Sequence, residues 1–124
     1  MITYKEMMAA ADAAVPRLKP EEAKAMIAAG NVLIVDVRDG TEVAATGKLK
    51  GAVHVARGSL EGKVDPDAPT YNPAFKRDQA VILHCAGGGR AALAGKTLKD
   101  MGYTKVFNGG GFKDLAGAGI EVEK

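Results

Sequence analysis

Residues 80–90, AVILHCAGGGR, combine an apolar run, a cysteine and a glycine-rich turn in one short stretch. A helical pattern follows this stretch, from Ala91 to Met101. A short apolar run that stops at glycines and is followed by a helix is typical of a strand–loop–helix unit. The sequence therefore predicts a buried strand that places Cys85 in a loop at the start of a helix.

The loop from Cys85 to Arg90 has the composition of an anion-binding site. Cys85 is the only cysteine of the chain, so it has neither an internal disulfide partner nor other thiolates with which to bind a metal. Backbone N–H groups of a glycine-rich loop at a helix N-terminus can converge on an anion, and such a setting favours a thiolate. Arg90 adds a fixed positive charge. We interpret Cys85 as a nucleophile, and the residues that follow it as an anion-binding loop: Ala86, Gly87, Gly88, Gly89 and Arg90.

An inert reading of the same loop is also open. A lone cysteine at the end of a strand is often a small apolar residue, and Gly87–Gly89 could form a simple flexible turn. Three ordered glycines cost about 0.5–1 kcal/mol each relative to alanine, whereas Asp or Ser would cap a helix without that cost. This cost favours a functional loop.

Two further strands are expected to end at the same edge as Cys85. Residues 32–37 form a β-branched run, typical of a buried parallel strand, and Asp36 lies near its carboxyl end. Arg38 and Glu42 follow closely enough to pair with each other. We expect Asp36, Arg38 and Glu42 to brace the neighbouring loops. Arg57 follows the next short strand and is a second candidate for binding an anionic substrate.

The two histidines and the proline-rich segment receive structural interpretations. His84 is adjacent to Cys85, but neighbouring strand residues point to opposite faces, so we interpret it as a packing residue. His54 has no ligand partners at metal-binding spacing and is interpreted in the same way. Residues 59–78 contain three prolines and are expected to form a surface loop. Its Tyr71 or Phe75 would either line the active-site pocket or lie in solvent.

Length and composition indicate one ordinary α/β domain. The chain has 124 residues, 47% of them hydrophobic and 26% charged, and a net charge of +2 that does not point to nucleic acid or a membrane surface. No apolar stretch approaches the roughly 20 residues that a membrane span needs. A free thiol suits a reducing compartment, so we expect a cytoplasmic protein. Residues 1–16 are expected to form a helical extension, and residues 17–124 the α/β domain.

Several short motifs stand in a recognisable order along the chain. They are Asp36-Val37-Arg38, Glu42, Gly51-Ala52-Val53-His54-Val55, Cys-x4-Arg from Cys85 to Arg90, and Gly109-Gly110-Gly111-Phe112. In this order they resemble the single-domain rhodanese family of sulfurtransferases. The resemblance implies a three-layer α/β/α domain with a mostly parallel, five-stranded sheet and the cysteine loop at its carboxyl edge.

The resemblance also implies a sulfurtransferase that carries sulfane sulfur as a persulfide on Cys85. Its donor would be a small sulfur-containing anion such as thiosulfate, or a persulfide-bearing protein, and its acceptor a thiol or cyanide. This ping-pong scheme divides one transfer into two steps and needs no cofactor or metal.

Two other functions compete with sulfur transfer. One is a rhodanese-like binding or regulatory module without turnover, although such modules usually lack the cysteine. The other is a cysteine-based phosphatase, whose loop places five residues between Cys and Arg to surround a phosphate. Four residues separate Cys85 from Arg90 here, which favours sulfur over phosphate.

Overall fold

The computed structural model describes all 124 residues. Four parallel strands form its central sheet, in the order β3-β1-β4-β5. Their bounds are β1 Val32–Asp36, β3 Val53–His54, β4 Ala80–Cys85 and β5 Val106–Gly111. A separate antiparallel pair is formed by β2 Lys48–Leu49 and β6 Val122–Glu123. The fold is the mixed α/β architecture with a mostly parallel sheet that the sequence predicted.

The main sheet has four strands, not the five that the resemblance implies, and only a single bridge forms beyond β5. Arg17 pairs with Asn108 of β5 as an isolated parallel bridge at the sheet edge. The prolines on either side limit this pairing, because Pro16 and Pro20 have no N–H to donate and Pro20 already begins a helix. The segment therefore crosses the edge of the sheet without forming a ladder.

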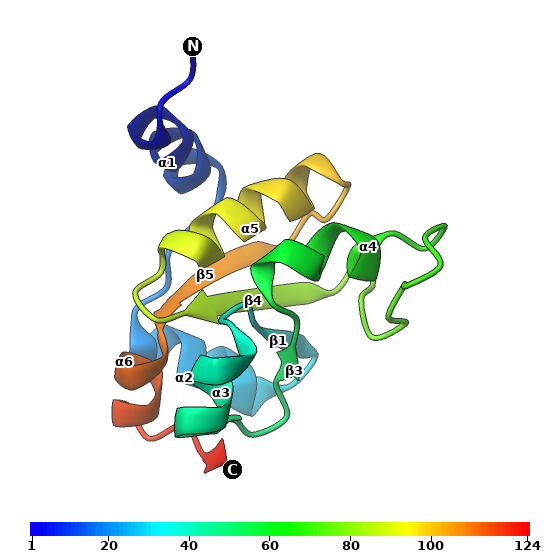
Figure 1. Ribbon diagram of the computed structural model, residues 1–124. Helices are drawn as coiled ribbons and strands as arrows, with labels where there is room; N and C mark the ends of the chain where they lie inside the picture. The colour runs from blue at the N-terminus through cyan, green and yellow to red at the C-terminus, as the bar shows by residue number, and fades with distance from the viewer.

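Helices cover both faces of the sheet (Figure 1). Helices α1, α4 and α5 lie on one side, where α5 packs on β4 and β5, while α2 and α6 lie on the other. The bounds are α1 Tyr4–Ala14, α2 Pro20–Ala29, α3 Gly40–Thr46, the 3-10 turn η1 Arg57–Ser59, α4 Leu60–Val64, α5 Gly89–Asp100 and α6 Phe112–Gly117. No helix has the length and apolar character needed to cross a membrane.

The helix ends follow from the sequence. A capping box between Thr3 and Glu6 begins α1, and Val15 ends it before Pro16. Pro20 occupies the first turn of α2, where its missing N–H has no cost. Helix α1 then packs along α5, so that the amino-terminal segment lies over the same face of the sheet as Cys85.

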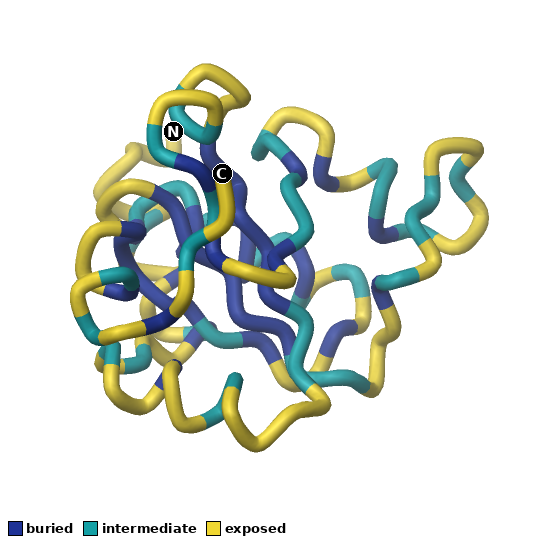
Figure 2. The backbone as a smooth tube through the Cα atoms, turned by 90° about the horizontal axis from the view of Figure 1, so that it is seen from below, coloured by how far each residue is buried: buried dark blue, intermediate teal, exposed yellow.

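The buried residues form two apolar clusters, one on each face of the sheet. Figure 2 shows the buried segments in dark blue at the centre of the molecule. Strand β4 contributes to both clusters by alternation: Val81, Leu83 and Cys85 pack on the α5 side, and Ile82 packs on the α6 side. His84 lies against the ring of Phe112, with centroids 6.2 Å apart. The prediction that His84 and Cys85 face opposite sides is confirmed.

The proline-rich segment at residues 59–78 does not line the active site. It forms η1, α4 and a series of turns, and Phe75 is completely buried against the edge of the Tyr103 ring, 6.5 Å between centroids. The Tyr103 hydroxyl donates to the Val64 carbonyl at 2.8 Å. Tyr103 follows the carboxyl end of α5, so the segment is anchored at the end of that helix remote from Cys85. Neither expected alternative, a pocket wall or a place in solvent, holds for Phe75, which lies in the core; Tyr71 is half-buried against that core and does not line the cavity beside the cysteine loop.

Candidate active site

Cys85 is the last residue of β4 and is only 1% exposed. Its Sγ accepts a hydrogen bond from the backbone N–H of Gly88 at 3.0 Å. Gly88 is the N-cap of α5 and has φ +105°, a conformation that glycine adopts without a Cβ clash. The turn therefore brings the backbone around the sulfur, at the positive end of a 12-residue helix.

Arg90 is bound by Glu42 at the side of this loop. Its two terminal nitrogens donate to the two carboxylate oxygens at 2.7 and 3.0 Å. The hydrogen bonds from Arg90 hold the pKa of Glu42 at about 2, below its ordinary 4.5, and the same pair raises the pKa of Arg90. The predicted pairing of Glu42 with Arg38 is therefore wrong. Glu42 also accepts a hydrogen bond from the N–H of Asp39 at the start of α3, and this contact directs its carboxylate toward Arg90.

The partner of Arg38 is Asp36, in a buried pair with three side-chain hydrogen bonds of 2.8–3.1 Å. Arg38 also donates to Thr46 Oγ1 and to the Gly47 carbonyl, each at 2.9 Å. Its guanidinium stacks on Phe112, 4.2 Å from the ring centroid. Burial raises the pKa of Asp36, but the hydrogen bonds from Arg38 outweigh it and hold that pKa below its ordinary value. The pair thus ties β1 to the end of α3 and to α6.

Neither histidine forms a hydrogen bond with the Cys85 sulfur. His84 is fully buried, neither of its ring nitrogens has a hydrogen-bond partner, and Asp36 Oδ2 is 3.9 Å away. Burial lowers the pKa of His84, so the ring is neutral near pH 7. His54 Nε2 lies 2.7 Å from the Arg38 carbonyl. Neither imidazole is placed to take a proton from Cys85.

Arg57 does not join the cysteine loop. Its guanidinium donates to Glu61 at 3.1 and 3.2 Å and to Thr97 Oγ1 at 3.0 Å. Thr97 lies in the second half of α5, about 12 Å along the helix from Gly89 at 1.5 Å per residue. The prediction that Arg57 binds substrate beside Cys85 therefore fails on position, since η1 turns the side chain along α5.

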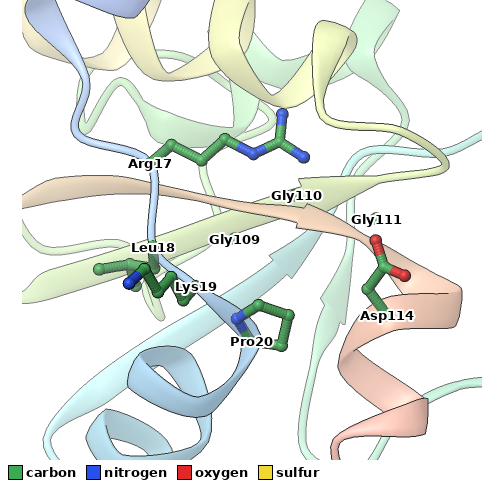
Figure 3. Close-up of a pocket in the computed structure, with 8 residues that line it drawn as sticks. All are labelled: Arg17, Leu18, Lys19, Pro20, Gly109, Gly110, Gly111 and Asp114. Atoms are coloured by element: carbon green, nitrogen blue, oxygen red, sulfur yellow. The ribbon is translucent and has the colours of Figure 1, made fainter.

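Two residues that the sequence analysis did not single out hold the outer side of the loop. Arg17 Nη2 donates to the Gly87 carbonyl at 3.2 Å, and buried Asn108 donates from Nδ2 to the Gly88 carbonyl at 3.0 Å. Figure 3 shows the Arg17 side chain extended across the end of β5. No local signal marks either residue, because the contacts span 70 and 20 positions of sequence.

A cavity of about 430 Å³ opens beside the loop. Its walls are Arg38, Glu42, Ala45, Thr46, Ala86, Phe112 and Lys113. Arg38 and Glu42 already have oppositely charged partners, whereas Lys113 is exposed and forms no ion pair. Lys113 is thus the cation of this cavity that is available to an anion.

The structure defines an α/β domain whose central strand ends in a cysteine, with the Gly88 N–H of the following loop donating to its sulfur. The Rhodanese-like domain family matches residues 19–118, and the chain belongs to that family. A further similarity is to the thiosulfate sulfurtransferase PspE of Escherichia coli, 29% identical over 68 residues, which are 55% of this chain. That match covers 60% of PspE, and separate matches to two longer curated proteins, both tRNA uridine(34) hydroxylases, cover 29% of the length of each.

Two solved structures resemble nearly the whole chain. One is a Rhodopseudomonas palustris protein of unknown function, described as a possible tyrosine phosphatase, with 37% identity and a TM-score of 0.90. That similarity covers 99% of this chain and 96% of the other. The second is the homodimeric polysulfide-sulfur transferase of Wolinella succinogenes, with 29% identity, a TM-score of 0.74 and coverage of 97% and 86%.

Proposed function

We propose that the protein is a sulfurtransferase that carries one sulfane sulfur atom on Cys85. The observation that carries this proposal is the Cys85 sulfur itself, buried at the positive end of α5 and accepting the Gly88 N–H at 3.0 Å. A sulfur in that position is stabilised as an anion without a general base. His84 is neutral near pH 7 and faces the opposite side of the sheet from Cys85, which is consistent with a reaction that needs no general base.

The transfer takes place in two balanced steps. The Cys85 thiolate attacks the outer sulfur of thiosulfate, a sulfur–sulfur bond forms, and sulfite leaves with the electron pair of the bond that breaks. Cyanide or a thiolate then attacks the outer sulfur of the Cys85 persulfide and leaves as thiocyanate or as a new persulfide. Cys85 recovers its thiolate, so neither an external oxidant nor a reductant is consumed.

The cavity beside the loop supports a small anionic donor. Lys113 supplies an unmatched positive charge, and Ala86 places the loop backbone at the cavity wall. Two relatives are named for their sulfur donors, thiosulfate and polysulfide. Both donors are anions with a terminal sulfane sulfur. We propose donors of this class, with thiol or cyanide acceptors, in a reducing compartment such as the cytoplasm.

Phosphatase chemistry is the second candidate, because one relative is described as a possible tyrosine phosphatase. The loop of this chain holds only four residues between Cys85 and Arg90. Both terminal nitrogens of Arg90 are also bound to Glu42, at 2.7 and 3.0 Å, so Arg90 would have to leave a bidentate partner to clamp a phosphate. These features favour sulfur transfer.

Mass spectrometry of the donor-treated protein tests the proposal. After incubation with thiosulfate or polysulfide and removal of excess donor, the peptide containing Cys85 should gain one sulfur atom and lose it again on addition of cyanide. Cys85→Ser should keep the fold and gain none, because a serine hydroxyl stays protonated. Failure of every sulfane donor to load the protein would support a non-catalytic module. Aryl phosphate hydrolysis that disappears in Cys85→Ser would support the phosphatase.

A further inference from the structure

A single peptide group connects Arg17 to the sulfur of Cys85. The carbonyl of Gly87 accepts a hydrogen bond from Arg17 Nη2 at 3.2 Å, and the N–H of Gly88 donates to Cys85 Sγ at 3.0 Å. These two groups belong to the same peptide bond, and the chain contains no cis peptide. In a trans peptide the C=O and the N–H point in opposite directions. Arg17 and the Cys85 sulfur therefore lie on opposite sides of this peptide group.

We propose that Arg17 is a positioning residue for Cys85, which orients and polarises the Gly87–Gly88 peptide so that its N–H stabilises the sulfur anion. A cation on the carbonyl draws electron density from the peptide and makes the N–H a stronger donor, as in other chains of hydrogen bonds. This inference rests on the proposed role of Cys85 as the nucleophile. Arg17 precedes residues 19–118, so it lies outside the region that matches the family.

The backbone and two glycines fix the guanidinium in this position. The N–H of Asn108 donates to the Pro16 carbonyl, and the N–H of Leu18 donates to the Asn108 carbonyl, both at 2.9 Å. Gly88 and Gly110 have positive φ, and a Cβ on either would lie against the Arg17 guanidinium. The lack of side chains there leaves the space that Arg17 fills, as Figure 3 shows for the end of β5.

Like Lys113, Arg17 carries a positive charge that no ion pair cancels. Arg90 is neutralised by the two oxygens of Glu42, whereas Arg17 forms no ion pair. Other titratable groups also lie near the loop, and they come from several neighbouring elements. They are Tyr4 of α1, Asp39 just before α3, Glu42 of α3, His84 of β4, Arg90 of α5, and Lys113 and Asp114 of α6. None of these touches the Gly87 carbonyl.

The test measures Cys85 itself, without any sulfur donor. The rate of alkylation by iodoacetamide is followed from pH 5 to 10 in the wild type and in Arg17→Met, Arg17→Lys and Lys19→Met. Lys19→Met is the matched control, because it removes one positive charge from the same surface pocket without touching the loop. Circular dichroism and urea unfolding establish that each variant is folded.

Arg17→Met should react about two- to fivefold more slowly at pH 7, the size expected of one exposed cation, with the midpoint of the pH profile moved upward. Arg17→Lys should recover part of the rate, and Lys19→Met should match the wild type. Equal profiles for Arg17→Met and the wild type, or an equal loss in Lys19→Met, would overturn the proposal. An effect of Arg17 on alkylation in a protein that no donor loads would instead overturn the proposed function alone.

Discussion

Replacing Gly88 with alanine tests the conformation on which the cysteine loop depends. Gly88 has φ +105° and ψ −9°, and an L-residue in the left-handed region costs about 1–2 kcal/mol. The new Cβ would also fall on the Arg17 guanidinium, whose displacement forfeits a hydrogen bond worth about 0.5–1.5 kcal/mol. Gly88→Ala should therefore lower the free energy of unfolding by about 2–3 kcal/mol.

Gly87→Ala is the matched control for this change. Gly87 has no positive φ, and a Cβ there would meet no atom within 4 Å, so its free energy of unfolding should change by less than about 0.5 kcal/mol. Urea unfolding of both variants measures the difference, and iodoacetamide reactivity reports whether the Gly88 N–H still reaches the sulfur. If the two variants are equally stable and equally reactive, the reasoning about the left-handed turn is refuted.

Three further changes address charges around the loop. Glu42→Gln should cost about 0.5–1 kcal/mol at pH 7 for a partly exposed pair. Because the pKa of Glu42 is depressed from 4.5 to about 2, this stabilisation exists above pH 4.5 and fades as pH falls toward 2, so urea curves of variant and wild type should converge there. Lys113→Gln should raise the KM for thiosulfate severalfold with kcat nearly unchanged in steady-state assays, and an unchanged KM would exclude Lys113 from donor binding. Asp36→Asn should destabilise by about 3–5 kcal/mol in urea, since it leaves the Arg38 guanidinium buried without its charge partner; a loss under 1 kcal/mol would show that the pair is replaceable.

The elements nearest Cys85 were predictable because their signals are local. An apolar run, three glycines and a helical pattern specify β4, the loop and α5 within a few residues of their observed bounds. The alternation of a strand was enough to separate His84 from Cys85. Proline also acts locally: Pro16 follows the end of α1 and Pro20 begins α2, because proline constrains the backbone wherever it occurs.

The partners of the long side chains were not predictable in the same way. Glu42 was expected on Arg38 and is found on Arg90, while Arg57 was expected at the loop and is found on Glu61 and Thr97. Each of these side chains can reach several positions from its Cα. Helix direction and capping select one of them, and both depend on how α3, η1 and α5 pack.

From its own pattern, therefore, the amino-acid chain specified a parallel α/β domain with Cys85 in a glycine-rich loop at the end of a buried strand. The folded arrangement alone brought Arg17 and Asn108 to the outer side of that loop, from positions 70 and 20 residues away. It also left one bridge beyond β5 in place of the fifth strand that the resemblance implied, and it placed Phe75 in the core. The physical reason is that contacts between distant segments depend on the packing of whole helices against the sheet, which no local sequence pattern encodes.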